Sequence, residues 1–360
     1  MRGGEKCLEA LCEIFPEAPI FTLFEDPEKL SQEIRRHRIT PSFLQKFPNI
    51  HRFYRYYLPL FPAAARSFKI RNADLLISTS HCAAKGFPKR DSALHISYCF
   101  TPMRYAWGLF DEYFGKKNVV MRAVLSAAFY YLRQWDKTTS AGVDQFVAIS
   151  DHVRQRIRAS YDRDAEIIYP PVDTVFFTPD ASKKREDFYL VASALVPYKR
   201  IDLVVQTFNT LGRKLVVIGT GPEEKRLRRM ASGNIEWLGW QSDEVLRDYY
   251  RRAKALIFPG EEDFGIVPVE MQACGGPVIA FEKGGALETV VRGKTGVFFE
   301  TQTPIALAQA LESFERMRWD PSASRENAER FSRERFKREM VHMIDRIAKK
   351  KGLKFHVAVL

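Results

Sequence analysis

Short apolar runs alternate with amphipathic segments throughout the second half of the chain. Each run is rich in Val, Ile, Leu, Phe or Tyr and is bounded by Gly, Pro or polar residues, a pattern that predicts a buried strand. The predicted strands are residues 188–192, 214–219, 235–239, 254–258, 277–281 and 296–299. Apolar residues at helical spacing predict helices over 201–211, 223–230, 243–252 and 304–316. This alternation indicates a parallel sheet covered by helices.

The first half shows a similar but less regular pattern. Strands bounded by turn or capping residues are predicted at 19–24, 73–80, 94–100, 145–150 and 166–169. The polar run 180–187 is typical of a linker between two domains. We therefore expect an α/β protein with one domain over 1–180, a second over 181–320, and a C-terminal helix with a basic tail over 321–360.

The composition is that of a globular protein. The chain has 360 residues, of which 46% are hydrophobic, so it can build two cores and is too apolar to be disordered. No run approaches the roughly 20 apolar residues that span a bilayer, and the N-terminus lacks a signal-peptide core, so we expect a cytoplasmic protein. Five cysteines without CxxC spacing suit reduced thiols and predict no structural zinc.

A basic and aromatic segment lies in the first half. The net charge of +12 favours anionic partners, and between Glu33 and Asp74 there is no acidic residue, while Lys and Arg alternate with Phe and Tyr. This pattern suits an anionic membrane surface. The alternative is that the aromatics belong to the core and the cations to an ordinary solvated surface. Nucleic acid is a weaker alternative, because no nucleic-acid motif accompanies the charge.

Two carboxylates, Glu262 and Glu270, flank a predicted strand-to-helix turn. Backbone amides near Gly265 and Ile266 would attract a phosphate, while the carboxylates could accept hydrogen bonds from sugar hydroxyls. The alternative is that the acids merely complement the helix dipole. The run 258–280 resembles the E-x7-E signature of family 4 retaining glycosyltransferases, which have the GT-B fold of two facing Rossmann-like domains with parallel sheets.

The resemblance assigns roles to the residues that match the signature. These residues are Glu262, Asp263, Phe264, Gly265 and Glu270. It implies that Glu262 contacts the donor sugar, that Glu270 contacts the ribose hydroxyls, and that the backbone of Phe264, Gly265 and Ile266 contacts the sugar and phosphates. It also makes the first domain the acceptor-binding domain and the second the nucleotide-sugar-binding domain.

Lys199 and Arg200 lie at a predicted helix start, where two cations oppose the helix dipole and are better explained by a bound anion. The loop resembles the family's diphosphate-binding segment, except that Ala194 replaces a frequent arginine.

Gly219 and the two residues after it do not form a dinucleotide fingerprint, because Glu224 replaces its third glycine. They resemble the glycine turn beside the donor nucleotide, and the resemblance places Gly239 and Trp240 near the base. The glycines at 284 and 285 are expected to form a turn and a helix start, with no chemical role.

Residues 77–86 and 99–107 resemble a bacterial and archaeal subgroup that builds surface polysaccharides and includes WbaZ-type mannosyltransferases. Phe100 stands where many relatives have a His facing the reaction centre. His81 is the substitute candidate, although a single His is more often structural. The resemblance also places Thr101, Arg104 and Tyr105 in the acceptor cleft.

Residues 1–6 resemble the glycine loop that normally follows the first strand of the fold, and that strand is missing. We therefore expect a truncated or misassigned start, because losing a buried parallel strand would expose apolar surface and unpaired backbone. Gly3 and Gly4 would let the backbone approach the sugar or phosphate closely.

Together these features predict a retaining hexosyltransferase that needs no metal or other cofactor. It would move a hexose such as mannose from a nucleotide-diphosphate sugar to a glycan or lipid-linked acceptor, with Glu262, Lys199 and His81 in catalytic roles. The main alternative is a catalytically silent GT-B subunit that binds a nucleotide sugar or a partner glycosyltransferase. A glycoside hydrolase is weaker, because the two carboxylates flank a turn rather than a glycosidic bond.

Overall fold

The computed structural model describes residues 3–70, 73–80, 82–103, 107 and 119–353, with the backbone alone for 119–125. The chain divides into two compact units. Unit 1 comprises Met1–Pro170 and Phe336–Leu360, and unit 2 comprises Pro171–Arg335. The sequence placed the division near residue 180 and the returning helix from 321 onward. The compact units instead divide at Pro170 and again at Arg335.

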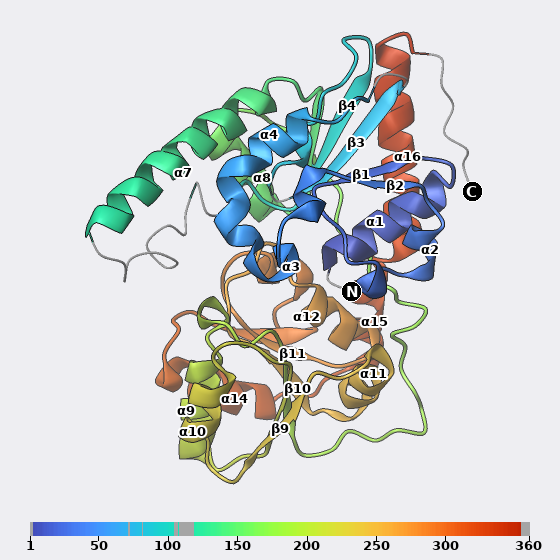
Figure 1. The fold of residues 1–360 in the computed structure, drawn as a ribbon. Coiled ribbons are helices and arrows are strands. Elements are labelled where there is room, and N and C mark those ends of the chain that lie inside the picture. Colours follow the sequence, from blue (N-terminus) through green and yellow to red (C-terminus); the bar gives the residue numbers. More distant parts are fainter. Residues whose placement is uncertain (1–2, 71–72, 81, 104–106, 108–118, 354–360) are drawn as a thin grey trace. The chain divides into compact units, whose positions relative to one another are not determined.

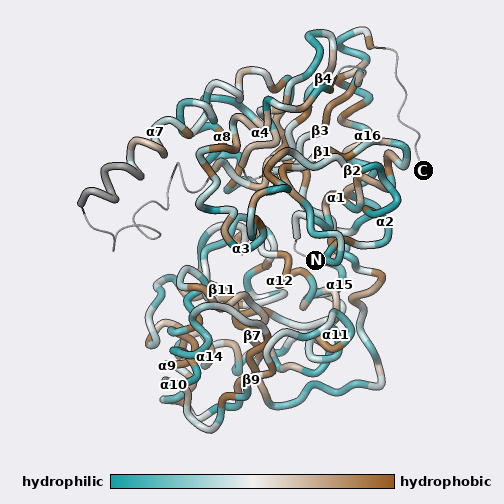
Figure 2. The backbone as a smooth tube through the Cα atoms, in the orientation of Figure 1, coloured by the Kyte–Doolittle hydropathy of each residue, from teal (hydrophilic) through white to brown (hydrophobic). Residues whose placement is uncertain are grey.

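Unit 2 is built on a six-stranded parallel sheet with the order β12-β11-β10-β7-β8-β9. Its strands are β7 (Tyr189–Ala192), β8 (Leu215–Ile218), β9 (Ile235–Gly239), β10 (Ala255–Phe258), β11 (Val278–Phe281) and β12 (Gly296–Phe299). Every strand predicted for this half of the chain is present. Strands β7, β8, β10 and β11 are apolar runs buried along their whole length, which explains this success. Hydrophobic colour accordingly concentrates along the sheet in Figure 2.

The helices of unit 2 follow the strands in alternation. They are α9 (Ile201–Leu211), α10 (Glu224–Met230), α11 (Asp243–Arg252), α12 (Ile266–Ala273), α13 (Ala286–Thr289), α14 (Pro304–Glu315) and α15 (Pro321–Glu329). Helices α9 and α14 pack on the sheet through residues such as Phe208 and Leu311, which are fully buried in one core cluster. The chain runs from β7 toward β8 on one side and from β10 toward β11 on the other. The carboxyl ends of β7 and β10 therefore form a topological switch point, where ligands bind in sheets of this kind.

Unit 1 contains two parallel sheets. One pairs β1 (Ile20–Thr22) with β2 (Ile39–Pro41), and the other has β3 (Leu75–Ser80), β4 (Leu94–Cys99), β5 (Gln145–Ala148) and β6 (Ala165–Ile167) in chain order. The sequence did not predict β2, which has three residues and is too short for a periodic signal. Among the described residues the first element is α1 (Gly3–Ile14), so Gly3 and Gly4 lie in a helical turn rather than in the expected loop.

Shorter elements and three long helices complete unit 1 (Figure 1). The short ones are η1 (Pro27–Lys29), α2 (Gln32–Arg35), η2 (Phe43–Lys46), α3 (Ile50–Phe53), η3 (Tyr54–Leu60), α4 (Phe61–Arg66) and η4 (Ala84–Gly86). The long ones are α7 (Val119–Ser140), α8 (Asp151–Tyr161) and α16 (Arg333–Lys350). Within the described residues, no helix is both long and apolar enough to cross a membrane.

The terminal stretch, expected to be one helix, consists of α15 and α16. The break falls at Phe331 and Ser332, because the Phe331 carbonyl accepts a hydrogen bond from the Val172 amide at 2.9 Å. Ser332 forms a β-bridge with Val172. Helix α16 then packs in unit 1, where the Phe336 ring lies edge-on to Tyr98 at a centroid distance of 5.5 Å.

Candidate donor site and the acceptor residues

The switch point of unit 2 brings a cation and a carboxylate together. Lys199 lies in η5 (Pro197–Lys199), beyond the end of β7, and Glu262 lies in the loop after β10. Their side chains form an ion pair and are 14% and 22% exposed. The sequence placed both residues in the donor site, and the structure brings them into direct contact at the edge where a ligand would lie.

Helix α12 begins directly after this loop. Gly265 is its N-cap residue, with φ of 93°, and it offers no side chain to cap the first amides. Phe264 is buried and packs edge-on against Phe331 at 5.5 Å, which fixes the turn. An anion at this helix start would complement both the amides and the helix dipole.

Glu270 lies in α12 and is only 5% exposed. The Tyr250 hydroxyl, from α11, donates a hydrogen bond to Glu270 Oε2 at 3.1 Å. Burial, together with the nearby Glu270 charge, raises the pKa of Tyr250 well above its usual value. Tyr250 therefore remains a neutral donor to this carboxylate, a partnership that no sequence motif indicated.

Arg200 holds the left-handed conformation, with φ of 53°, at the N-cap of α9. Its guanidinium donates to Asp202 Oδ1 and to Gln302 Oε1, each at 3.2 Å. Gln302 in turn donates to the Pro259 carbonyl at 2.7 Å, in the loop that leads to Glu262. Arg200 thus links the loop after β7 to the loop after β10, and Ala194 is exposed nearby in sequence.

Glycines let the loops of this site approach one another. A Cβ at Gly219 would lie 1.9 Å from the Ser193 carbonyl oxygen, so a side chain there would collide with the segment that follows β7. Gly239 also has a positive φ, at 68°, and the next residue, Trp240, is 74% exposed. The side chain of Trp240 is available for stacking at the end of β9.

Gly284 and Gly285 hold the backbone of the carboxylate loop, a role that sequence reasoning missed. The Gly285 amide donates to the Glu262 carbonyl at 2.8 Å. A Cβ at Gly284 would lie 2.3 Å from that same oxygen, and one at Gly285 would lie 2.3 Å from the Phe264 Cα. The paired glycines were visible in the sequence, but their contact partners were not.

The residues expected to meet the acceptor belong to unit 1. His81, Arg104 and Tyr105 lie outside the described residues. Thr101 is buried, and its hydroxyl has no hydrogen-bond partner among the described residues. Phe100 packs edge-on to Tyr98 at 5.7 Å, and a Cβ at Gly4 would lie 3.2 Å from its ring. Gly4 and Phe100 are thus neighbours at the start of α1.

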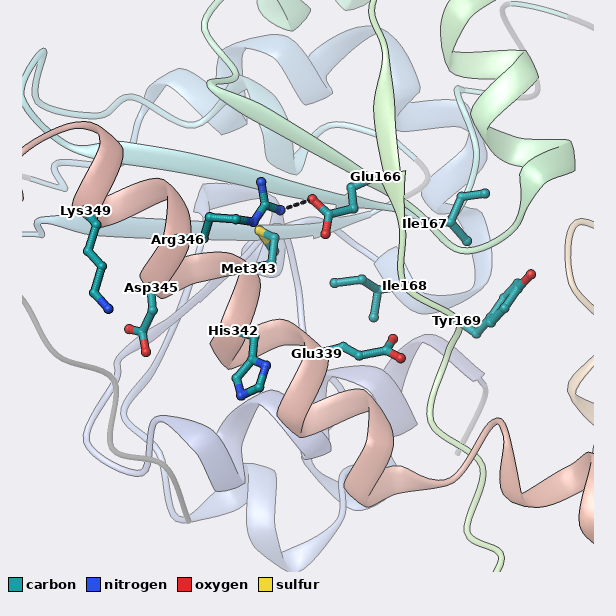
Figure 3. Close-up of a pocket in the computed structure, with 10 residues that line it drawn as sticks. All are labelled: Glu166, Ile167, Ile168, Tyr169, Glu339, His342, Met343, Asp345, Arg346 and Lys349. Carbon is teal, nitrogen blue, oxygen red and sulfur yellow. Dashed lines mark hydrogen bonds and ion pairs between the residues drawn. The ribbon is translucent and has the colours of Figure 1, made fainter.

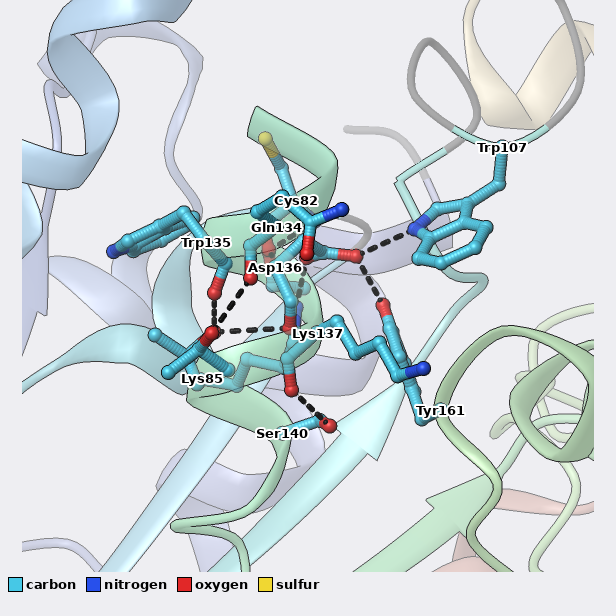
Figure 4. Close-up of polar contacts among 12 residues, drawn as sticks. Cys82, Lys85, Trp107, Gln134, Trp135, Asp136, Lys137, Ser140 and Tyr161 are labelled. Atoms are coloured by element: carbon cyan, nitrogen blue, oxygen red, sulfur yellow. Dashed lines mark hydrogen bonds and ion pairs between the residues drawn. The ribbon is translucent and has the colours of Figure 1, made fainter. Parts of the chain in front are cut away.

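A buried polar cluster in unit 1 was not indicated by any motif (Figure 4). Asp136, on α7, is fully buried and forms an ion pair with Lys85. It also accepts hydrogen bonds from Trp107 Nε1 at 2.8 Å and from the Tyr161 hydroxyl at 2.7 Å. Burial raises the pKa of the Cys82 thiol to about 12. Asp136 thus connects Lys85, Trp107 and Tyr161, and these contacts stabilise a single arrangement of α7, α8 and Trp107.

An open depression of about 910 Å³ lies between α16 and the segment 166–169 in unit 1 (Figure 3). Arg346 forms an ion pair with Glu166 across it. Its lining includes none of the residues predicted for the donor or acceptor. In the part of the chain that the structure describes, no group of three His, Cys, Asp or Glu side chains could hold a metal ion.

Known proteins are similar to this chain in fold and, over unit 2, in sequence. The two Rossmann-like units have the GT-B fold of glycosyltransferases. The fold is similar to that of Anabaena HepE, solved in complex with UDP, with a TM-score of 0.70, 14% identity and coverage of 96% of each chain. Residues 174–338, which include nearly all of unit 2, match the family described as glycosyl transferases group 1.

Two curated relatives are similar over a part of their length. An uncharacterised glycosyltransferase of Methanocaldococcus jannaschii is 26% identical over 202 residues, which are 55% of each chain. A GDP-mannose-dependent alpha-(1-6)-phosphatidylinositol monomannoside mannosyltransferase of Mycobacterium tuberculosis is 28% identical over 200 residues, 47% of this chain and 52% of the relative. The chain thus spans about half the length of the curated relatives it matches.

Proposed function

We propose that the protein is a retaining glycosyltransferase that moves a hexose from a nucleotide-diphosphate sugar to a glycan or lipid-linked acceptor. The observation that carries this proposal is the Lys199–Glu262 ion pair at the switch point of unit 2. It lies beside the start of α12, so one site combines a cation, a carboxylate and helix-terminal amides. The match of this unit to group 1 glycosyltransferases supports the same reading of the chemistry.

The roles of the side chains follow from their surroundings. Glu262 is partly exposed and would accept hydrogen bonds from hydroxyls of the donor sugar. Lys199 and the amides that begin α12 would hold the diphosphate, with Arg200 and Gly219 shaping the adjoining loops. Glu270, fixed by Tyr250, would accept from the ribose hydroxyls. Trp240 and Gly239 would lie near the base.

Transfer would proceed on the face of the sugar from which the diphosphate leaves. The bond from the anomeric carbon to the phosphate oxygen breaks, and the acceptor hydroxyl oxygen forms the new bond to that carbon. The leaving phosphate takes the acceptor proton, so the reaction needs neither a carboxylate nucleophile nor a metal. Lys199 and the helix amides stabilise the charge that develops on the phosphate, which is the usual source of rate in such sites.

Mannose is the sugar that we expect, because one of the curated relatives is named as GDP-mannose-dependent. Together with the sequence resemblance to WbaZ-type enzymes, this supports a cytoplasmic mannosyltransferase of surface polysaccharide synthesis. The same relative is named for a phosphatidylinositol mannoside acceptor, which supports a lipid-linked acceptor here.

Thermal unfolding with GDP-, UDP- and ADP-sugars tests the donor site directly. A ligand at about 100 times its dissociation constant should stabilise the protein by about 2.7 kcal/mol. Stabilisation by one nucleotide that is reduced in Lys199→Gln, but retained in Lys225→Gln on the exposed face of α10, would support the proposal. Absence of any shift with all three would contradict it.

The second candidate is a silent GT-B subunit that binds the nucleotide sugar without transferring it. Phe100 favours this function, because an apolar ring packed on Tyr98 stands where the resemblance implies a His facing the reaction centre. A Phe100→His variant separates the two functions. Nucleotide-dependent stabilisation without turnover in either form would favour the silent subunit, while turnover by the natural chain would exclude it.

A further inference from the structure

Four large apolar side chains are exposed along one stretch of unit 1. Tyr56 is 80% exposed, Phe43 is 40% exposed, and Phe53 and Leu60 are each 38% exposed. They come from η2, α3 and η3, three short elements that follow one another in the chain (Figure 1). Single exposed apolar residues are ordinary, but several on adjoining elements mark an interaction site.

The exposed rings contact neighbouring rings and are not needed to fill the core. Phe53 and Tyr56 lie edge to face with a centroid distance of 6.1 Å, and Phe43 contacts Phe47 at 5.9 Å. Other residues of the same elements pack in the core. These are Leu44, Ile50 and Leu58, which are buried in one cluster. The stretch therefore has a buried side that anchors it and an apolar side left to solvent.

Exposed cations border these rings. Arg52 lies 5.3 Å from the centroid of the Phe53 ring, and Arg55 lies 5.6 Å from that of Tyr54. Lys46, Arg66 and Lys69 are exposed on the same segment. In unit 2, by contrast, two of the exposed cations of α10 pair with acids at the start of that helix, Arg226 with Glu223 and Arg228 with Glu224. The sequence between Glu33 and Asp74 contains no acidic residue, so this segment carries an excess of positive charge.

We propose that residues 43–69, the aromatic-basic surface, bind an anionic lipid bilayer. Cations beside exposed aromatic rings match such an interface, because the charges attract anionic headgroups while the rings settle at headgroup depth. No described helix could span a bilayer, so this contact would be peripheral. It would bring the enzyme to the membrane where a lipid-linked acceptor resides, yet binding itself requires no nucleotide sugar.

Sedimentation with vesicles tests the proposal on the full chain. The protein should bind vesicles of equal parts phosphatidylglycerol and phosphatidylcholine, and should bind phosphatidylcholine alone weakly. The double variant Arg52→Gln/Arg55→Gln should lower the partition coefficient roughly fivefold per charge at low salt. The matched control is Lys225→Gln/Arg229→Gln, which removes two exposed cations from α10 and should bind as the natural chain does.

A second variant probes the apolar part. Phe53→Ser/Tyr56→Ser should reduce binding at high as well as low salt, because it removes apolar area that the bilayer would bury and leaves the charge unchanged. These side chains are exposed, so an unchanged thermal midpoint should accompany the loss of binding.

Equal binding to both vesicle types would overturn the proposal, and so would binding of the double arginine variant as strong as that of the natural chain. Binding to single-stranded DNA with none to anionic vesicles would assign the surface to nucleic acid and overturn it as well. Nucleotide-dependent stabilisation, measured on the same variants, reports separately on the donor site.

Discussion

The Tyr250 hydroxyl donates a hydrogen bond of 3.1 Å to Glu270 Oε2, and both side chains are buried in unit 2. The two residues come from α11 and α12, which pack against each other. A buried carboxyl group needs hydrogen-bond partners, and such partners also fix its orientation. Tyr250 is therefore a positioning residue for the carboxylate assigned to the ribose hydroxyls.

Tyr250→Phe should weaken nucleotide binding roughly tenfold, since about 1.4 kcal/mol is a moderate value for a lost hydrogen bond to a charged group. The effect should fall on the dissociation constant and Michaelis constant of the donor rather than on the turnover number. Titration calorimetry with the nucleotide identified by thermal unfolding measures it. Tyr249→Phe, at the neighbouring position of α11, is the control. Equal nucleotide affinities of the two variants would show that Tyr250 does not support donor binding.

Glu262 and Glu270 should respond differently to the same substitution. Glu270→Gln should chiefly weaken nucleotide binding, because the group is buried beside Tyr250. Glu262→Gln should chiefly lower transfer, on the order of 100-fold, as expected when a group that acts in the transition state is removed. Steady-state kinetics with varied donor separates the two effects. Glu261→Gln, the exposed neighbour, controls for loss of charge in the loop. Wild-type kinetics in both main variants would refute the assigned roles.

Most of unit 2 could be predicted from the sequence, because its central strands are continuous apolar runs and helices such as α9 and α11 are amphipathic. Strand β2 and the break between α15 and α16 could not be predicted. Three residues carry no period, and the break depends on Val172, which is distant in the sequence.

The candidate donor site could likewise be predicted only in part. The motif around Glu262 and the loop at Lys199 could be recognised from the local sequence, and the topology of the sheet at its switch point explains why the two residues meet. The contact of Tyr250 with Glu270 depends on how α11 packs against α12. The close approach of Gly285 to Phe264 likewise depends on tertiary packing. Neither leaves a signal in a single sequence.

Gly285→Ala should impair donor binding and lower the stability of unit 2, in which the residue lies. The added Cβ would lie 2.3 Å from the Phe264 Cα and carbonyl oxygen, so backbone must move and displace the Glu262 loop. Gly233→Ala is the matched control, because a Cβ there meets nothing within 4 Å. Thermal unfolding with and without nucleotide measures both effects. Retention of the full ligand-induced stabilisation in Gly285→Ala would show that the glycine does not support the site.

His95 should make the stability of unit 1 sensitive to acid. It lies buried in β4, where Ser78 Oγ is 2.9 Å from its Nε2. Burial, reinforced by the Lys89 charge, lowers the pKa of His95 from its usual 6.5 to about 4. Below pH 6.5, His95 is therefore protonated in the unfolded chain while it stays neutral in the folded chain until the pH approaches 4. Stability is fully present above that pH and falls as the pH drops toward 4, by roughly 3 kcal/mol in total.

Denaturant unfolding at a series of pH values between 4 and 7 measures this slope. His95→Gln cannot take up the proton, so its free energy of unfolding should fall less steeply with acid, even if the variant is less stable at pH 7. The reference is His51→Gln, which removes an exposed histidine from α3 and leaves β4 intact. A slope in His95→Gln as steep as in His51→Gln would mean that groups other than His95 govern the acid response in this pH range. Asp144 is not such a group. Burial raises its pKa, but hydrogen bonds from Lys351, the His95 amide and Lys89 outweigh this and lower the pKa to about 2, so its contribution should be lost only below the range in which His95 acts.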